Sequence, residues 1–192
     1  MDIPKGSGLV HDRRPNQTDA DLLGIYLNDH LAGATLGTDR ARSLAESEAE
    51  RDPALSDAVG PIADEIAEDR ADLLHIMRSL DVPVRHYKIV AGRLAERVGR
   101  LKANGRVVRR SPLAPMLELE LLRLGVEGKA AAWRTLRRLA DADDRLDPGR
   151  LDSLLERAER QLETLEALRL RQVAETFQPW SEAMAASQGS RV

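Results

Sequence analysis

Four polar side chains in predicted helices have the chemistry of metal ligands. His30 lies in the segment YLNDHLAGATLG, residues 26–37, and Asp69, Asp72 and Glu127 follow later in the chain. Imidazole and carboxylate groups together suit Fe, Mn or Zn. The alternative is a buried histidine hydrogen-bonded to an acid, a pair that orients helices and carries out no chemistry. Both interpretations stay open, and the sequence favours the pair.

His75 and Glu163 are lesser candidates for the same site. Asp72-Leu73-Leu74-His75 places a carboxylate and an imidazole one helical turn apart, a spacing that suits two ligands but is common by chance. Glu163 is the acid that the last helix could contribute. Lys129, close to Glu127 in the chain, could neutralise a buried acid, but we expect its ammonium group to reach solvent.

Four long helices are expected to position these side chains. A capping side chain precedes a proline at Asp52-Pro53, Ser111-Pro112 and Asp147-Pro148, which is typical of a helix start because the missing N–H of proline costs nothing there. With a further start near Thr18, the helices span residues 19–49, 53–80, 112–141 and 148–178. We therefore predict an all-α protein with one bundle domain at residues 19–178 and flexible tails at residues 1–18 and 179–192.

Apolar residues spaced by three and four indicate the buried face of each helix. In the first two helices the stripes are Leu23, Leu27, Ala34, Gly37, Ala41 and Leu44, and Val59, Ile62, Ile66, Leu73, Ile76 and Leu80. In the last two they are Leu113, Leu117, Leu124 and Ala131, and Leu151, Leu155, Ala158, Leu162 and Leu165. His30, Asp69 and Glu127 interrupt the first three stripes. If the helices pair, His30 meets Asp69, with Glu127 near the same imidazole.

Four long helices with a long connection between the second and third resemble the ferritin-like bundles. That resemblance implies a ferritin-like fold, a homodimer and a di-metal site with Fe or Mn, built from a Glu on helices one and three and Glu-x-x-His on helices two and four. This chain departs from that pattern, because helix one offers His30 and helix four contains no histidine. Two stretches, YLNDHLAGATLG and RRSPLAPMLELELLRLGVEGKAAAW, are also similar to actinobacterial proteins.

The connection between the second and third helices is strongly basic. Residues 85–110 contain nine Lys or Arg and one acid, for a formal charge of +8, whereas the whole chain carries −3. A short amphipathic helix is predicted there, with Tyr87, Val90, Leu94, Val98 and Leu101 on its apolar side. Arg93, Arg97 and Arg100 would then face outward and could contact an anionic membrane surface or an acidic partner. Nucleic acid is disfavoured, because aromatic residues for base stacking are lacking there.

Composition excludes several classes of function. The chain of 192 residues has no cysteine, which removes disulfides and thiolate metal sites, and only 3% aromatic residues. It contains no Gly-rich phosphate loop and no Ser-His-Asp arrangement. No apolar run is long enough for a signal peptide core or a membrane span, so a cytoplasmic protein is expected. The favoured function is a structural or interaction module without enzymatic activity, and the alternative is a metal-dependent oxidoreductase or iron-handling protein.

Overall fold

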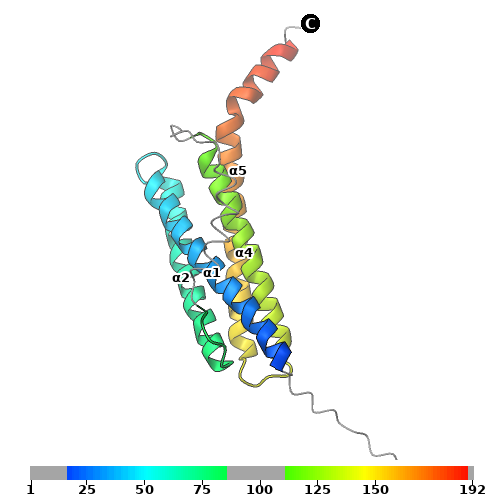
Figure 1. Ribbon diagram of the computed structural model, residues 1–192. Helices are drawn as coiled ribbons and strands as arrows, with labels where there is room; N and C mark the ends of the chain where they lie inside the picture. Colours follow the sequence, from blue (N-terminus) through cyan, green and yellow to red (C-terminus); the bar gives the residue numbers. More distant parts are fainter. Residues whose placement is uncertain (1–16, 86–110, 190–192) are drawn as a thin grey trace, which may run out of the picture.

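The computed structural model describes residues 17–85 and 111–189, and these form four α-helices (Figure 1). They are α1 (Gln17–Glu48), α2 (Pro53–Ser79), α4 (Ala114–Leu139) and α5 (Pro148–Gly189). No strand occurs in these two ranges, so the predicted all-α class is confirmed for them. The predicted connection helix, with Arg93, Arg97 and Arg100, lies outside the described residues.

Capping side chains fix the starts of α2 and α5. The carboxylate of Asp52 accepts a hydrogen bond from the N–H of Leu55 at 3.0 Å, and that of Asp147 accepts one from the N–H of Gly149 at 2.9 Å. Each satisfies a helix-terminal donor that has no partner inside the helix. These two predicted starts are therefore confirmed, and the reason is local to the sequence.

The predicted helix boundaries differ from the structure by one or two residues, except at the starts of α2 and α5, which agree, and at the end of α5. α4 begins at Ala114, two residues after the predicted start, because Ser111 and Pro112 belong to a turn that precedes the helix. α5 continues to Gly189, eleven residues beyond the predicted end at residue 178. Pro179 does not end α5, because strong helix formers follow it in the segment EAMAAS. Figure 1 shows α5 extending past the level at which α4 begins.

Neighbouring helices run in opposite directions. The hydroxyl of Tyr26, near the start of α1, donates to Thr135, near the end of α4, at 3.3 Å. Arg40, near the end of α1, contacts Glu118, near the start of α4, at 2.6 Å. α1 packs mainly on α2, and α4 mainly on α5. α2 therefore ends at the opposite end of the bundle from the start of α4, as Figure 1 shows.

The buried face of α4 is not the predicted one. Its buried residues are Pro115, Leu119, Leu122, Val126, Ala130, Ala132, Trp133 and Leu136. Leu117 and Leu124, which we placed on the buried stripe, have 48% and 64% of their surface exposed. The first half of α4 carries leucines on both faces, so apolarity alone does not show which face turns inward. On the true face, Lys129 occupies the register position between Val126 and Trp133.

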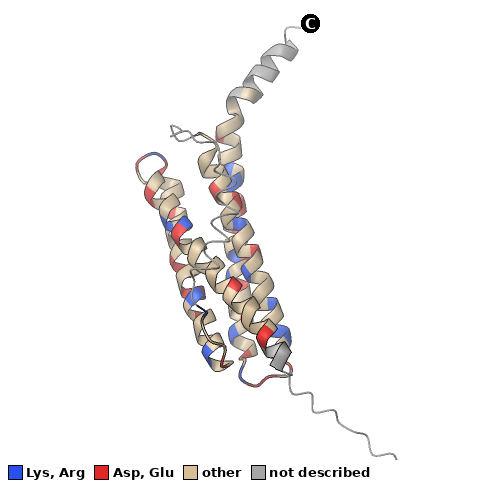
Figure 2. Ribbon diagram, in the orientation of Figure 1, with Lys and Arg blue, Asp and Glu red and all other residues tan. Residues whose placement is uncertain are grey.

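One contiguous core links all four described helices. It contains Leu27 and Leu31 of α1, Leu55 and Met77 of α2, Leu119 and Trp133 of α4, and Leu151, Leu154 and Leu165 of α5, among others. Acidic and basic positions occur along all four helices and do not gather at one end (Figure 2).

Asp52 joins the α1–α2 turn to α5 and supports the fold in two ways. Besides capping α2, it forms an ion pair with Arg171 and accepts a hydrogen bond from Gln172 at 3.0 Å. We expect Asp52→Ala to lower the free energy of unfolding by about 1 to 2 kcal/mol, because it removes both interactions. Asp52→Asn keeps an oxygen for the cap and should cost only about 0.5 kcal/mol. Urea denaturation of both variants measures this, and equal losses would contradict the assigned capping role.

Candidate functional site

A buried carboxylate stands at the centre of the bundle. Asp69 lies in the buried stripe of α2 between Ile66 and Leu73, and only 1% of its side chain is exposed. A charged group taken out of water needs a partner of opposite charge, or its burial is strongly unfavourable. The buried acid that the sequence predicted at this place is therefore confirmed, and its charge must be neutralised by neighbouring groups.

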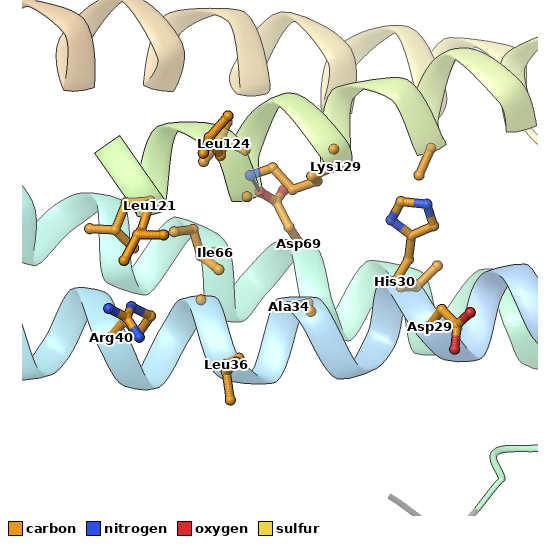
Figure 3. A pocket seen from close by; sticks show the side chains of 18 of the residues that line it. Asp29, His30, Ala34, Leu36, Arg40, Ile66, Asp69, Leu121, Leu124 and Lys129 are labelled. Atoms are coloured by element: carbon orange, nitrogen blue, oxygen red, sulfur yellow. Dashed lines mark hydrogen bonds and ion pairs between the residues drawn. The ribbon is translucent and has the colours of Figure 1, made fainter. Parts of the chain in front are cut away.

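The partner of Asp69 is Lys129. Its ammonium group forms an ion pair with Asp69 Oδ2 and donates a second hydrogen bond to Oε1 of Gln161. The lysine side chain is 12% exposed, so the expectation that Lys129 reaches solvent is wrong. Figure 3 shows Lys129 extending from α4 to meet Asp69. Burial lowers the pKa of Lys129 below its ordinary value, and the attraction of Asp69 opposes that shift.

A second cation, Arg157 of α5, completes the neutralisation. Its Nη2 lies 2.6 Å from Oδ1 of Asp69 and 3.1 Å from Oδ2 of Asp72. Its Nη1 lies 2.8 Å from Oε2 of Glu68. Arg150, two turns earlier in α5, holds the other side of Asp72 through contacts of 2.6 and 2.8 Å. The planar guanidinium group suits such shared contacts with several carboxylates.

These contacts set the register between α2 and α5. Moving toward the C-terminus along α2, Glu65, Asp69 and Asp72 meet partners that move toward the N-terminus along α5. The matching partners are Gln161, Arg157 and Arg150, and the bond from Gln161 Nε2 to Glu65 Oε2 is 2.7 Å long. A slip of either helix by one turn would break all of these pairs. The polar residues therefore fix how α2 and α5 align.

The four residues proposed as metal ligands do not form one group. Asp69 and Asp72 share Arg157, whereas Glu127 is 53% exposed and contacts Arg134 at 3.5 Å. Within residues 17–85 and 111–189, no three His, Asp or Glu side chains are grouped so that they could hold a metal ion. The lesser candidates, His75 and Glu163, are exposed. The described residues therefore provide no ligand set for Fe or Mn.

His30 lies at the edge of the core and does not pair with Asp69. Its ring packs edge-on against Tyr26, with the ring centroids 4.5 Å apart. Partial burial lowers the pKa of His30 below its ordinary value, and the nearby carboxylate of Asp29 opposes that shift. The imidazole is thus held in its neutral form over a wider pH range than an exposed histidine, and it contacts an aromatic ring instead of an acid.

The buried polar residue in the opening segment is Asn28, which the sequence analysis missed. Its amide nitrogen donates to the backbone oxygens of Gly24 at 2.7 Å and Pro83 at 3.1 Å, and its oxygen accepts from the N–H of Arg85 at 2.7 Å. Asn28 thereby fastens the segment after α2 to α1. The signal for its burial was its place next to Leu27, a residue of the core.

A cleft lies between α1 and α4, above the ion pair. Its volume is about 320 Å³, and its floor includes Ile66, Asp69 and Leu73 of α2. The α1 wall includes His30, Gly33 and Gly37, and the α4 wall includes Leu121, Leu124, Gly125, Gly128, Lys129 and Trp133. Figure 3 shows Leu121 and Leu124 on α4 across the cleft from Arg40 and Ala34 on α1. The lining is mainly apolar, and its charged residues are Asp29, Arg40, Asp69 and Lys129.

Comparison of this chain with known proteins identifies no relative. Searches against protein-family models, curated proteins and solved structures find no match to this chain. None of the described helices has a stretch long and apolar enough to cross a membrane. The predicted homodimer and the contact with an anionic surface through Arg93, Arg97 and Arg100 stay predictions.

Replacing Asp69 tests how strongly the network holds the fold. Asp69→Leu leaves Lys129 and Arg157 buried without their shared counter-ion, so we expect a loss of about 3 to 5 kcal/mol in the free energy of unfolding. Lys129→Met should cost less, because Arg157 still neutralises Asp69. The double variant should be more stable than Asp69→Leu alone. Glu127→Gln, at an exposed acid, serves as the control and should change stability by no more than about 0.5 kcal/mol. Strictly additive losses would show that Asp69 and Lys129 are not coupled.

His30 should make stability depend on pH in mild acid. Its pKa is lowered in the folded protein from the ordinary value of 6.5, so the unfolded chain binds more protons between those two values. The contribution is therefore complete above pH 6.5 and is lost as the pH falls through the folded pKa. We expect His30→Gln to make this fall shallower in thermal melts. His75→Gln, at an exposed histidine, should leave it unchanged, and the same slope in all three proteins would refute the assignment.

Proposed function

We propose that this protein is a non-catalytic binding module that takes a small, mainly apolar ligand into the cleft between α1 and α4. The observation that carries the proposal is open space above helical glycines. A Cβ atom built on Gly33, Gly125 or Gly128 would meet nothing within 4 Å, and all three residues line the cleft. Gly33 and Gly125 are exposed, so this space is open to solvent, and the side chains missing from both walls contribute to the cleft.

Glycine at these positions is unfavourable for the helices themselves. In the interior of a helix it costs about 0.5 to 1 kcal/mol relative to alanine. None of the glycines has the positive φ angle that would require this residue, and no neighbouring atom excludes a methyl group at Gly33, Gly125 or Gly128. Backbone geometry and packing therefore give no reason for glycine here. Room for a bound molecule would be a reason for glycine at these positions.

The size and lining of the cleft suit a small elongated ligand. Ligand pockets commonly measure roughly 300 to 1,000 Å³ and are mainly apolar with a few polar groups, as this cleft is. The lining runs from Asp29 to Arg40 along α1, which corresponds to a length of about 16 Å at the helical rise per residue. Leu121, Leu124 and Ile66 supply apolar contacts along this length.

The order and directions of the helices support a ferritin-like arrangement, since α1 and α4 run opposite to their neighbours and α2 ends far from the start of α4. The absence of a metal ligand set among the described residues gives no support to the alternative, an oxidoreductase with a site inside the bundle. Asp69 and Lys129 form an ion pair with each other, and the role of this pair is to stabilise the packing of the helices. A binding module is therefore the function that these observations support best.

Binding of the neutral apolar dye Nile red tests the proposal. The fluorescence of the dye should rise with the unmodified protein, because the cleft removes it from water. Gly128→Leu places a side chain in the open space and should weaken binding about tenfold or more, since it occupies the volume that the dye needs. Ala167→Leu adds the same side chain at an exposed position of α5, outside the cleft, and is the control.

Two results would overturn the binding module. One is the absence of saturable dye binding to the unmodified protein. The other is equal binding by the Gly128→Leu and Ala167→Leu variants, which would place the dye on another apolar surface, such as that formed by Leu170 and Trp180 of α5. Circular dichroism spectra and thermal melts of both variants would show that each is folded.

A further inference from the structure

The C-terminal part of α5 carries an exposed apolar stripe. Its members are Leu170, Val173, Phe177 and Trp180, and the sequence places Met184 at the next position of the same spacing. Leu170, Phe177 and Trp180 are 53%, 42% and 66% exposed. Residues spaced alternately by three and four form the seam of a coiled coil. The stripe lies on a different side of α5 from Leu165 and Gln172, which are buried, so it is not the face that packs in the bundle.

The same part of α5 projects from the bundle. Arg171 and Gln172 bind Asp52 in the turn between α1 and α2, so α5 is still beside the other helices at this level. From Gln172 it continues to Gly189, a length of roughly 25 Å at the helical rise per residue, and Figure 1 shows it passing the start of α4. An isolated helix of about this length is only marginally stable in water, and most helical stability comes from packing of an apolar face. A surface that covers the stripe would therefore stabilise the projecting part.

The charges near the stripe restrict what that surface is. Residues 172–189 contain no Lys or Arg and two acids, Glu175 and Glu182. An amphipathic helix that lies on an anionic membrane carries Lys or Arg on its polar face, so this segment does not suit such a membrane. Between residues 170 and 184, the heptad positions that flank the stripe hold Ala174, Thr176, Ser181 and Ala183. All of these are small and uncharged, so two identical stripes can meet without like charges opposed along their edges.

We infer that this stripe binds the same stripe of a second copy of the chain, so that two α5 helices pack together beside the two bundles. The spacing by three and four suits a helix as the partner, because it keeps one seam continuous along a pair of helices. A second copy supplies a seam of matching length that is equally apolar and uncharged. Self-complementary contacts of this kind, with two-fold symmetry, are the commonest in homo-oligomers.

This contact is separate from the proposed ligand site. None of the described residues that line the cleft between α1 and α4 belongs to α5. The dimer therefore does not require a ligand in the cleft, and a ligand in the cleft does not require the dimer. Each can fail without the other, and each has its own variants.

Sedimentation velocity of the full chain over a range of protein concentrations tests the second copy. The unmodified protein should form a dimer with a dissociation constant on the order of micromolar, since a seam of two heptads is short. Leu170→Glu places a carboxylate in the seam and should weaken the dimer about thirtyfold or more. Ala167→Glu adds the same charge at an exposed position of α5 that is off the stripe, and it should leave the dissociation constant unchanged.

The fluorescence of Trp180 reports the same contact. Trp133 is buried and Trp180 is exposed, so a change of emission with concentration is expected from Trp180. The emission should move to shorter wavelength as the unmodified protein is concentrated, because the indole ring leaves water in the dimer. Leu170→Glu should not show this movement, and Ala167→Glu should. Circular dichroism spectra show whether both variants are folded, and if Leu170→Glu is not, the emission of the unmodified protein decides.

Three results would overturn the inference. One is a monomer at every concentration, with unchanged emission of Trp180. Another is a dimer that Leu170→Glu and Ala167→Glu weaken equally, which would place the contact elsewhere on the molecule. The third is binding of the monomer to vesicles with anionic lipids that Leu170→Glu abolishes, which would assign the stripe to a membrane surface. Failure of the binding module is seen separately, in the dye measurements with Gly128→Leu.

Discussion

The ion pair between Asp69 and Lys129 is the constraint on which the arrangement of the helices depends. α2 and α4 are not neighbours in the bundle, and a long lysine stem is what joins them across its centre. A carboxylate buried in this way is tolerated only where cations and hydrogen-bond donors surround it. Lys129 and Arg157 must therefore arrive at the same point from two different helices, and this requirement leaves little freedom in how α4 and α5 are placed against α2.

The cleft between α1 and α4 lies above this ion pair. Lys129 turns its polar end toward α2, where it meets Asp69. On the α1 wall of the cleft the small residues include Gly33, Ala34 and Gly37, and on the α4 wall they include Gly125 and Gly128. The neutralised pair forms part of the floor, and the leucines of α4 form part of the walls. The cleft therefore has a neutralised ion pair in its floor and apolar residues along its walls.

The helices could be predicted from the sequence because their signals are local. Asp52 and Asp147 cap helices through their own neighbouring N–H groups, and these contacts need no information from the rest of the chain. The buried face of α4 could not be predicted in the same way, since Leu117 and Leu124 compete with Leu119 and Val126 and only tertiary packing decides between them. The predicted face of α4 contains Glu127 and leaves Lys129 exposed, whereas in the structure Lys129 is buried and Glu127 is exposed.

The candidate site was predicted in part. The buried position of Asp69 followed from its place in an apolar stripe, but its partner did not, because a histidine on a neighbouring helix is a more familiar core residue than a lysine. Burial of Lys129 depends on two acceptors, Asp69 and Gln161, that are distant in the chain. The pattern of α4 did contain the signal, since Lys129 continues the spacing of Leu122, Val126, Trp133 and Leu136.

The glycines that line the cleft are the part of the bundle that its own packing does not explain. Helical glycines at Gly33, Gly125 and Gly128 lower stability where alanine would fit, and replacement of glycine by alanine at such places commonly stabilises a protein. The ligand proposed for the cleft would occupy this volume, and because it would bind only the folded chain, it would shift the folding equilibrium toward the bundle.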